Sequence, residues 1–467
     1  MKVLLLVPKV TRLFEEAPLG IMYIAAVIRN AGHSVELLDG NAGFLRSELA
    51  RRFVHGDVPD LIGMACTTLT FPLVMELADF IGKIHPDVKI IIGGSHATIM
   101  PETLLANPNI DYCVIGEGEE TIRRFAYSLR SSIEDDSDMD KPWIKGIAYL
   151  GEDKDVHFND KQEPIQDLDS IPFPARDLLD PIYFKNGRTT LIASRGCPYN
   201  CNYCQPTLRK MFGNKVRRRS VQNVVDEMLE MYEKFGIRFF KFVDDTFTAD
   251  RNWTIAFCKK VFETFNDSGK HVNLECLTRV NDVDLEMLRA MKKAGFYVLD
   301  FGVECGSQRI LDYYRKGITV AQSIEAVKMC KKAGIKAHTC LMIGAPIETM
   351  EDINETRKLI KKMSPDSLCV AITTPMPHTA MWDALVKDGV LSEQDWLKVG
   401  DYLQKWGGVC QNVSEKELFK LKQEIQRNFW LRKAMKNPKL LYDYMRYHDS
   451  GSFIRAARYF LWKGDYS

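Results

Sequence analysis

The sequence predicts an α/β protein in which two units of alternating strands and helices are followed by a helical C-terminal region. Short apolar segments alternate with helical segments over about the first 125 residues, and the same alternation resumes from Thr189 to about Trp382. A polar stretch that contains several prolines separates the two units. The chain of 467 residues is long enough for two or three domains.

Five strands are expected in the first unit, each a short apolar run followed by a helical segment. This pattern is typical of a parallel sheet with helices on both faces, so we expect a Rossmann-like, flavodoxin-like unit. Ligands of such sheets bind outside the carboxyl ends of the strands. The expected strands are residues 3–7, 34–38, 61–65, 88–92 and 112–115.

A connector and a second unit follow. Residues 131–140 are polar, a hairpin is expected around Gly151 and Glu152, and prolines recur at 171–174, all of which indicate a connector. Six β/α units then predict a partial (β/α)6 barrel with polar residues at the strand ends of one face. Its expected strands are residues 189–193, 239–243, 273–277, 298–303, 336–343 and 367–373.

The stretch from about residue 386 is expected to be helical. Its aromatic residues suit a lid or a substrate wall; they include Trp396, Trp406, Phe429, Trp430, Tyr442, Tyr444 and Tyr447. Residues 453–463 are basic and amphipathic, which leaves two alternatives. We favour packing against the barrel over contact with a membrane surface.

Composition excludes several classes of partner. The 63 basic and 62 acidic residues give a net charge of +1, so no nucleic-acid partner is expected.

The N-terminal apolar run ends at Pro8 without the features of a signal peptide, and no segment supplies about 18 uninterrupted apolar residues for a membrane span. Twelve irregularly spaced cysteines indicate reduced thiols. We therefore expect a cytoplasmic protein, for which peripheral membrane contact stays open.

The charged run before the helix expected near Ser220 has two interpretations. Lys215 and the arginines at 217–219 favour a solvated face, because charge runs usually lie in water. Anchoring of a cofactor phosphate is the alternative.

Three cysteines in one short loop after a strand are the most informative residues: Cys197, Cys201 and Cys204. Thiolates at such spacing are typical ligands of iron–sulfur clusters, and three of them leave one iron open to a reactant. A zinc site completed by a distant residue and chance clustering are the alternatives. Structural zinc sites favour paired C-x2-C motifs, and the chain has no second pair.

The C-x3-C-x2-C spacing resembles that of the radical S-adenosylmethionine (SAM) superfamily. The resemblance implies a [4Fe-4S] cluster whose open iron is chelated by SAM, and reductive cleavage of SAM to a 5′-deoxyadenosyl radical that abstracts hydrogen from an unactivated carbon. It also implies an external electron donor such as flavodoxin or ferredoxin. The residues that it assigns to SAM are Glu304, Asp244, Asp245, Arg279 and Arg315. Residues 243–245 are Val-Asp-Asp where the family usually has Gly-Gly-Glu, and simple ion pairing inside the barrel is the alternative for all five.

The first unit lacks G-x-G-x-x-G after its first strand and lacks a Walker A sequence, which argues against a dinucleotide or nucleoside triphosphate. Its segments 18–26, 32–33, 93–98 and 116–121 resemble the cobalamin-binding domain of one radical SAM subfamily. The residues implied to bind cobalamin are Thr67, Thr68, Gly93, Gly94, Ser95, His96, Glu117 and Gly118. A tight turn at Gly93 and a hydrogen-bonded loop residue at His96 are the alternatives. The D-x-H-x-x-G pattern is absent, so no histidine ligand to cobalt is predicted.

The resemblance implies a cobalamin-dependent radical SAM enzyme, foremost a C-methyltransferase that uses methylcobalamin and consumes two SAM per product. Oxidative cyclisation or rearrangement, as in relatives of the anaerobic magnesium-protoporphyrin cyclase, is the first alternative; a cobalamin-free scaffold or a carrier without turnover is the second. The expected substrate is a small apolar molecule such as a lipid, a tetrapyrrole or a natural-product precursor. No catalytic residue is assigned. The expected division is 1–135 cobalamin domain, 136–184 linker, 185–385 barrel and 386–467 helical region.

Overall fold

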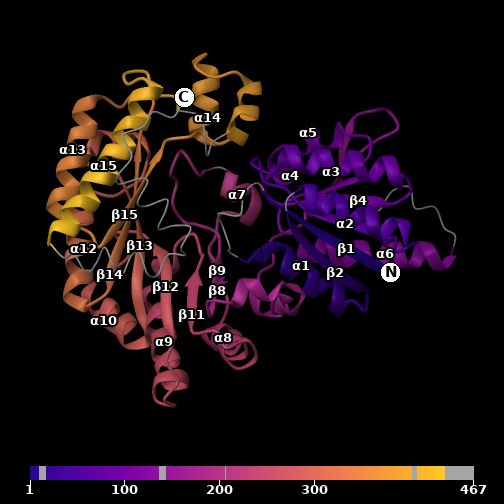
Figure 1. Cartoon of the computed structure of the whole chain (residues 1–467), viewed down its shortest axis with the longest axis horizontal. Coiled ribbons are helices and arrows are strands. Elements are labelled where there is room, and N and C mark those ends of the chain that lie inside the picture. The colour runs from indigo at the N-terminus through magenta and orange to yellow at the C-terminus, as the bar shows by residue number, and fades with distance from the viewer. Residues whose placement is uncertain (10–16, 41, 136–143, 206, 402–407, 437–467) are drawn as a thin grey trace.

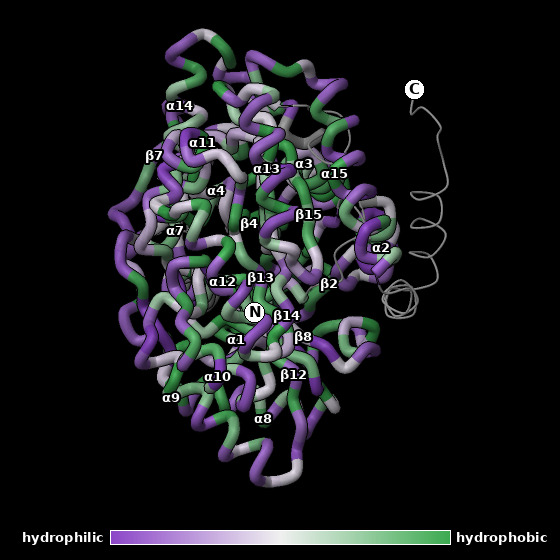
Figure 2. The backbone as a smooth tube through the Cα atoms, turned by 90° about the vertical axis from the view of Figure 1, so that its left-hand side faces the viewer, coloured by the Kyte–Doolittle hydropathy of each residue, from purple (hydrophilic) through white to green (hydrophobic). Residues whose placement is uncertain are grey.

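Two β-sheets lie side by side, each covered by helices (Figure 1). The computed structural model describes residues 1–9, 17–40, 42–135, 144–205, 207–401 and 408–436. Most of the outermost turns are hydrophilic, whereas hydrophobic residues follow the strands inside (Figure 2). Among the described residues, no helix has the length and apolar character that a membrane span needs.

The first sheet has the predicted flavodoxin-like order. Its parallel part runs β2-β1-β3-β4-β5, and the hairpin β6–β7 continues it in antiparallel pairing. The hairpin predicted at Gly151 is therefore present, and the connector contributes two strands to this sheet. The bounds are β1 Lys2–Pro8, β2 Ser34–Gly40, β3 Leu61–Ala65, β4 Lys89–Gly93, β5 Tyr112–Val114, β6 Ile147–Leu150 and β7 Val156–Phe158.

Helices bury both faces of this sheet. Along β1, Val3 and Leu5 point to one core and Leu4 and Leu6 to the other, because successive strand residues face opposite sides. The first core also contains residues of α1 and α6, and the second contains residues of α2 and α3. The bounds are α1 Leu19–Asn30, α2 Ala42–Val54, α3 Phe71–Ile84, α4 Ser95–Ile99, α5 Pro101–Leu105 and α6 Glu119–Asp135.

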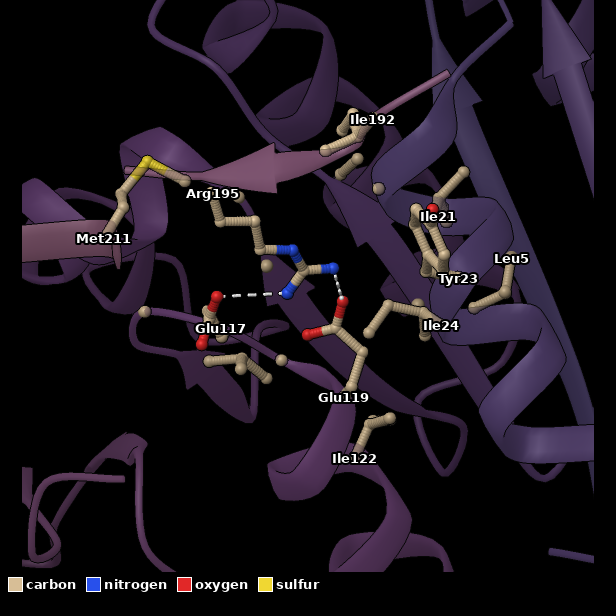
Figure 3. A pocket seen from close by; sticks show the side chains of 18 of the residues that line it. Leu5, Ile21, Tyr23, Ile24, Glu117, Glu119, Ile122, Ile192, Arg195 and Met211 are labelled. Atoms are coloured by element: carbon tan, nitrogen blue, oxygen red, sulfur yellow. Dashed lines mark hydrogen bonds and ion pairs between the residues drawn. The ribbon is translucent and has the colours of Figure 1, made fainter. Parts of the chain in front are cut away.

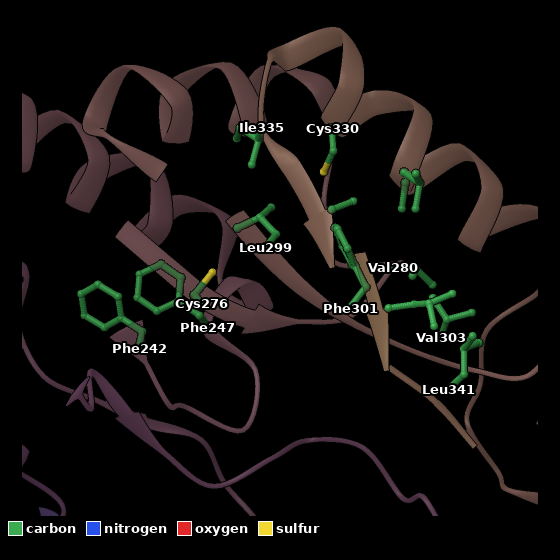
Figure 4. Close-up of a cluster of buried hydrophobic side chains, with 14 of the residues drawn as sticks. Phe242, Phe247, Cys276, Val280, Leu299, Phe301, Val303, Cys330, Ile335 and Leu341 are labelled. Atoms are coloured by element: carbon green, nitrogen blue, oxygen red, sulfur yellow. The ribbon is translucent and has the colours of Figure 1, made fainter. Parts of the chain in front are cut away.

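The second sheet is the predicted partial barrel of six parallel strands, in the order β8-β11-β12-β13-β14-β15. Its strands are β8 Arg188–Leu191, β11 Phe239–Phe242, β12 Asn273–Thr278, β13 Phe296–Glu304, β14 Lys336–Ile343 and β15 Ser367–Ile372. Between them run α8 Val221–Phe235, α9 Arg251–Val261, α10 Leu285–Ala294, α11 Gln308–Tyr313, α12 Val320–Ala333 and α13 Met350–Met363. The core between strands and helices is apolar and contains Phe242, Leu299 and Phe301 (Figure 4).

The inner face of the barrel is polar. Residues that alternate with the buried core positions of the strands are half-buried, among them Lys241, Glu275, Asp300 and His338. Lys241 Nζ lies 3.5 Å from Glu275 Oε1 and 3.9 Å from Asp300 Oδ2. Such a lumen can receive a polar or charged group of a ligand.

Short elements join the two units. The strands β9 Ser194–Arg195 and β10 Arg217–Arg218 form an antiparallel ribbon, and α7 Thr207–Phe212 lies between the sheets in Figure 1. The connector forms short 3-10 helices at Leu168–Ser170, Arg176–Leu178 and Pro181–Phe184. Two further short elements, η4 Phe247–Ala249 and η5 Phe262–Asn266, flank α9.

The C-terminal region is helical over its described part, with α14 Ala380–Lys387, η6 Glu393–Asp401 and α15 Glu415–Lys436. Trp396 contacts the rings of Phe71 and His96 in the first unit, and Phe429 packs into the barrel core. The predictions for Trp406, for 453–463 and for the tyrosines at 442, 444 and 447 fall outside the described residues. We propose that the domain boundaries lie at residues 135, 184 and 385. The strands β6 and β7 of the linker extend the first sheet.

The prediction of a solvated face at 217–219 is wrong. The side chains of Arg217 and Arg219 are buried, and Arg218 lies over the ring of Trp253. Glu227 of α8 accepts from Arg219 Nη1 at 2.5 Å and from Arg176 Nη2 at 2.9 Å. Arg176 belongs to the connector, so this buried triad ties the connector to the barrel.

Removal of the Glu227 carboxylate should destabilise the protein strongly. In Glu227→Ala two buried guanidinium groups lose their counter-charge, and we expect the free energy of unfolding to fall by about 3–5 kcal/mol, measured by urea denaturation. Glu230→Ala on the same helix is the matched control, because Glu230 pairs with Lys234 near the surface and should cost less than about 1 kcal/mol. Equal losses in the two variants would contradict the stabilising role of the triad.

Candidate functional site

A cavity of about 260 Å³ lies where the carboxyl ends of the first sheet meet the barrel (Figure 3). The first unit contributes Gly93, Gly94 and residues 116–119 of the loop after β5. The barrel side contributes Arg195, Met211, Phe212, Asp244 and Asp245. Residues predicted for two different cofactors thus line a single space.

The cavity continues as an apolar slot into the first unit. The slot passes between the sheet and the helices α1 and α6, and its walls include Leu5, Ile21, Ile24, Ile91 and Ile122. An apolar slot of this kind favours an aromatic or aliphatic group over a charged one.

The backbone of the first unit leaves room for a large, flat ligand. A Cβ placed on Gly20 would meet no atom within 4 Å, and one on Gly93 would meet only Val114 at 3.9 Å. Both residues line the cavity, so side chains there would occupy ligand space. Gly94 has φ +103°, and its Cβ would lie 2.6 Å from the carbonyl oxygen of Cys66, so only glycine fits. These residues fit a bulky cofactor such as cobalamin at the strand ends.

A buried ion network closes one side of the cavity. Glu117 accepts from Arg195 Nη1 at 3.1 Å and from Arg217 at 2.8 and 2.9 Å, and its Oε2 also accepts from the backbone N–H of Ile165 at 2.8 Å. Arg195 also pairs with Glu119 (Figure 3). Glu117 was predicted to contact cobalamin; it lines the cavity, but its carboxylate joins the two units.

The remaining polar residues predicted for cobalamin lie apart from the cavity lining. His96 is fully buried, with Nδ1 3.2 Å from Thr68 Oγ1 and Nε2 3.0 Å from Thr103 Oγ1. Burial lowers the pKa of His96 to about 4, so the imidazole is neutral. This geometry corresponds to the hydrogen-bonded alternative. Thr67 is exposed and pairs with Thr70, and Ser95 begins α4.

The three-cysteine loop is fixed through its backbone. Asn202 donates its backbone N–H to Tyr314 O at 3.0 Å and its side-chain amide to Tyr313 O at 2.7 Å. Met381 at the start of α14 donates to Asn202 O at 2.9 Å. The loop is therefore held against α11 and α14 by groups other than the thiols, which stay available as ligands.

Burial disfavours the thiolate forms of Cys197 and Cys204 unless a cation is bound. Burial is the main cause that raises the pKa of Cys204, to about 12, and the nearby Cys201 raises it further. Burial also raises the pKa of Cys197. Metal binding ionises such thiols and stabilises the thiolates, so the donor set fits an iron–sulfur cluster.

Glu304 and Arg279, which the sequence analysis assigns to SAM, lie against this loop. Tyr203, between two of the cysteines, donates to Glu304 Oε1 at 3.1 Å, and Arg279 Nη1 lies 3.5 Å from Cys201 Sγ. Glu304 has φ +65°, a strained conformation for a residue other than glycine. Sequence reasoning missed Lys316, whose Nζ lies 2.5 Å from Glu304 Oε1; its place after the family-like segment at 301–306 was the only signal.

Asp244 and Asp245 differ in environment. Asp244 is buried and accepts from Ser194 Oγ at 2.5 Å and from Ala193 N at 3.1 Å. Asp245 faces the cavity and is exposed there. Desolvation by the cavity walls, and next the charge of Asp244, raises the pKa of Asp245 to about 6. Arg315 is exposed and does not line the cavity.

Family models match both units. A B12 binding domain matches residues 6–126 and the Radical SAM superfamily matches residues 191–360. An uncharacterised methyltransferase of Pyrococcus horikoshii is 31% identical over 98% of this chain and 97% of its own. The anaerobic magnesium-protoporphyrin IX monomethyl ester cyclase of Rubrivivax gelatinosus is 28% identical over 79% of this chain and 66% of its own.

Solved structures agree in fold. TsrM from Kitasatospora setae, a radical SAM methyltransferase with cobalamin and a [4Fe-4S] cluster bound, superposes with a TM-score of 0.70 at 18% identity. The match covers 83% of this chain and 75% of TsrM. Together with the cysteine loop and the shared cavity, these matches show that the chain belongs to the B12-dependent radical SAM enzymes. Its cofactors are a [4Fe-4S] cluster, SAM and cobalamin.

Loss of the Glu117 charge should loosen the contact between the two units. Glu117→Gln keeps the shape of the side chain but leaves Arg195 and Arg217 short of a buried counter-charge, so we expect a loss of about 2 kcal/mol or more in unfolding free energy. Trypsin should also cleave the connector faster. Glu102→Gln, in the short helix α5, is the control and should change neither property. Unchanged stability and cleavage in Glu117→Gln would show that the network does not hold the units together.

Proposed function

We propose that the protein is a C-methyltransferase that places a methyl group on an unactivated carbon of a small apolar molecule. The observation that carries this proposal is the single cavity bounded by the strand ends of the B12-binding unit and by Asp244 and Asp245 of the barrel. The methyl donor and the SAM site would share this space, so that a substrate carbon could meet both. The apolar walls favour an apolar substrate.

The predicted residues that lie at the cluster loop have roles in this proposal. When bound, the cluster supplies an electron to SAM and cobalamin supplies the methyl group. Cys197, Cys201 and Cys204 would hold the cluster, and the Arg279 guanidinium beside Cys201 would offset thiolate charge. Glu304, oriented by Lys316 and Tyr203, would contact the ribose or amino-acid part of SAM.

The two aspartates and the glycines complete the proposed cofactor contacts. Asp245, with Asp244 behind it, would accept a hydrogen bond from the SAM amino group. Gly93, Gly94 and Gly118 would let the corrin ring approach the backbone. An external flavodoxin or ferredoxin would deliver the electron, and we propose a cytoplasmic location for the reaction.

Oxidative cyclisation without methyl transfer is the second candidate. It is favoured by the likeness to the magnesium-protoporphyrin cyclase over 79% of the chain. The products of SAM distinguish the two. Anaerobic holoenzyme with SAM, reductant and candidate apolar substrates should yield S-adenosylhomocysteine together with 5′-deoxyadenosine, quantified by mass spectrometry. Formation of 5′-deoxyadenosine alone would favour cyclisation.

Cys201→Ala should abolish reductive SAM cleavage, because the cluster would lose one of its three protein ligands. Anaerobically reconstituted wild-type protein should contain about four iron atoms per chain, and the variant should contain far less. Cys410→Ser is the matched control, since Cys410 is half-buried elsewhere and should leave iron and cleavage intact. Persistent reductive cleavage of SAM in Cys201→Ala would contradict the role of Cys201 as a cluster ligand.

SAM affinity should depend on the ionisation of Asp245. The pKa of this carboxyl is raised to about 6, so it is neutral below that pH and charged above it. The charged carboxylate accepts a hydrogen bond from the SAM amino group more strongly than the neutral carboxyl does. The Kd for SAM should therefore rise by up to about tenfold per pH unit below about pH 6, measured by equilibrium dialysis. Asp245→Asn should bind weakly without this pH dependence. A wild-type affinity that stays flat down to about pH 5 would contradict the assignment.

A further inference from the structure

A second group of soft ligands lies inside the barrel, on the strands β14 and β15. His338 and Cys340 belong to β14 and Cys369 belongs to β15. One ligand atom of each residue lies within 4.8 Å of those of the other two. None of the three belongs to the loop at 197–204 or to the lining of the cavity between the units.

The strand geometry brings these side chains together. His338 and Cys340 are two residues apart and therefore project from the same face of β14. In the parallel register, Cys340 is the partner of Cys369 and His338 is the partner of Ser367. The three residues are half-buried, whereas their neighbours Leu341, Leu368 and Val370 are buried in the apolar core. The group therefore faces the polar lumen from a rigid scaffold.

We propose that His338, Cys340 and Cys369 bind a zinc ion inside the barrel. Two thiolates and one imidazole form a donor set that suits Zn²⁺, and a tetrahedral ion bound by three protein ligands keeps one position open. Within the described residues, the group contains no fourth His, Cys, Asp or Glu. The open position points to the lumen and would take a water molecule or a nitrogen or sulfur atom of a ligand.

A neighbouring hydroxyl orients the histidine of this group. Nδ1 of His338 lies 2.8 Å from Ser367 Oγ, a contact that orients the ring as partners of zinc-bound histidines do. Three carboxylates act electrostatically on the group: Glu275 and Asp300 on His338, and Asp300 and Glu304 on Cys340. Three ammonium groups face them, because Lys241 lies 3.9 Å from Asp300, Lys316 pairs with Glu304 and Lys422 of α15 lies near Cys369. The surrounding charges are therefore balanced, and the site rests on its donor set and on the oriented imidazole.

The position of this group relates it to the proposed SAM site. Gly302 on β13 is the register partner of Cys340, and Glu304, which lies against the cluster loop, ends β13 two residues later. A heteroatom held by the zinc would therefore anchor a substrate beneath the SAM site. This use rests on the proposed function; the metal site itself does not.

Metal content of the full-length protein tests the site. In the variant with Cys197, Cys201 and Cys204 all changed to alanine, the cluster loop can bind no metal, so any zinc belongs elsewhere. We expect about one zinc per chain in this background, measured by plasma mass spectrometry after anaerobic purification. Adding Cys369→Ser should abolish it, and adding Cys410→Ser should not. Circular dichroism of each variant checks its fold.

Cobalt substitution gives a readout that is independent of turnover. Co²⁺ added to the metal-free loop variant should give the intense visible bands of a tetrahedral thiolate site, and these should weaken in Cys340→Ser, which retains one thiolate. The proposal would be overturned if the folded loop variant showed neither zinc nor cobalt bands. It would also be overturned if Cys340→Ser and Cys369→Ser left the bands unaffected. A Cys340–Cys369 disulfide in anaerobically purified protein would also overturn it. None of these outcomes depends on methyl transfer.

Discussion

The pairing of Glu117 with Arg195 and Arg217 is the interaction on which the arrangement of the two units depends. Buried charges are tolerated only with partners, and here the carboxylate comes from one unit and both guanidinium groups from the other. Arg195 lies two residues before Cys197, and Glu117 lies in the loop at the strand ends of the B12-binding unit. The same contact therefore sets the distance between the two proposed cofactor sites.

In the barrel, the residues that hold the scaffold are different from the residues proposed to bind ligands. Backbone hydrogen bonds and the Arg176–Glu227–Arg219 triad fix the scaffold, so the cysteine thiols, Glu304 and Asp245 need not hold the fold together. Inside, the polar lumen and the half-buried group at His338 add ligand-binding capacity beneath the cluster loop. Rigid support of this kind keeps reactive groups in place when substrates enter.

Much of the fold could be predicted from the sequence. Strand β3 has the predicted bounds, because a parallel strand buried on both faces is a continuous apolar run. Strand β14 also has the predicted bounds, and it alternates buried residues with half-buried ones that face the lumen. The burial of Arg217 and Arg219 could not be predicted, since it depends on Glu117 and Glu227, which are 100 and 8 residues away from their partners. Lys316 was missed for the same reason, since its partner Glu304 is 12 residues away and α11 lies between them in the sequence.

The sequence by itself determined the alternation of strands and helices and the three-cysteine loop, because hydrophobic periodicity and ligand spacing are local properties of the chain. Only the tertiary structure decided that the two predicted cofactor regions share one cavity, that His96 is a buried neutral side chain and that Glu117 joins the units. It also brought Cys369 to His338 and Cys340. These outcomes follow from contacts between residues far apart in sequence. Such contacts bury ionisable side chains and thereby set their charge and their partners.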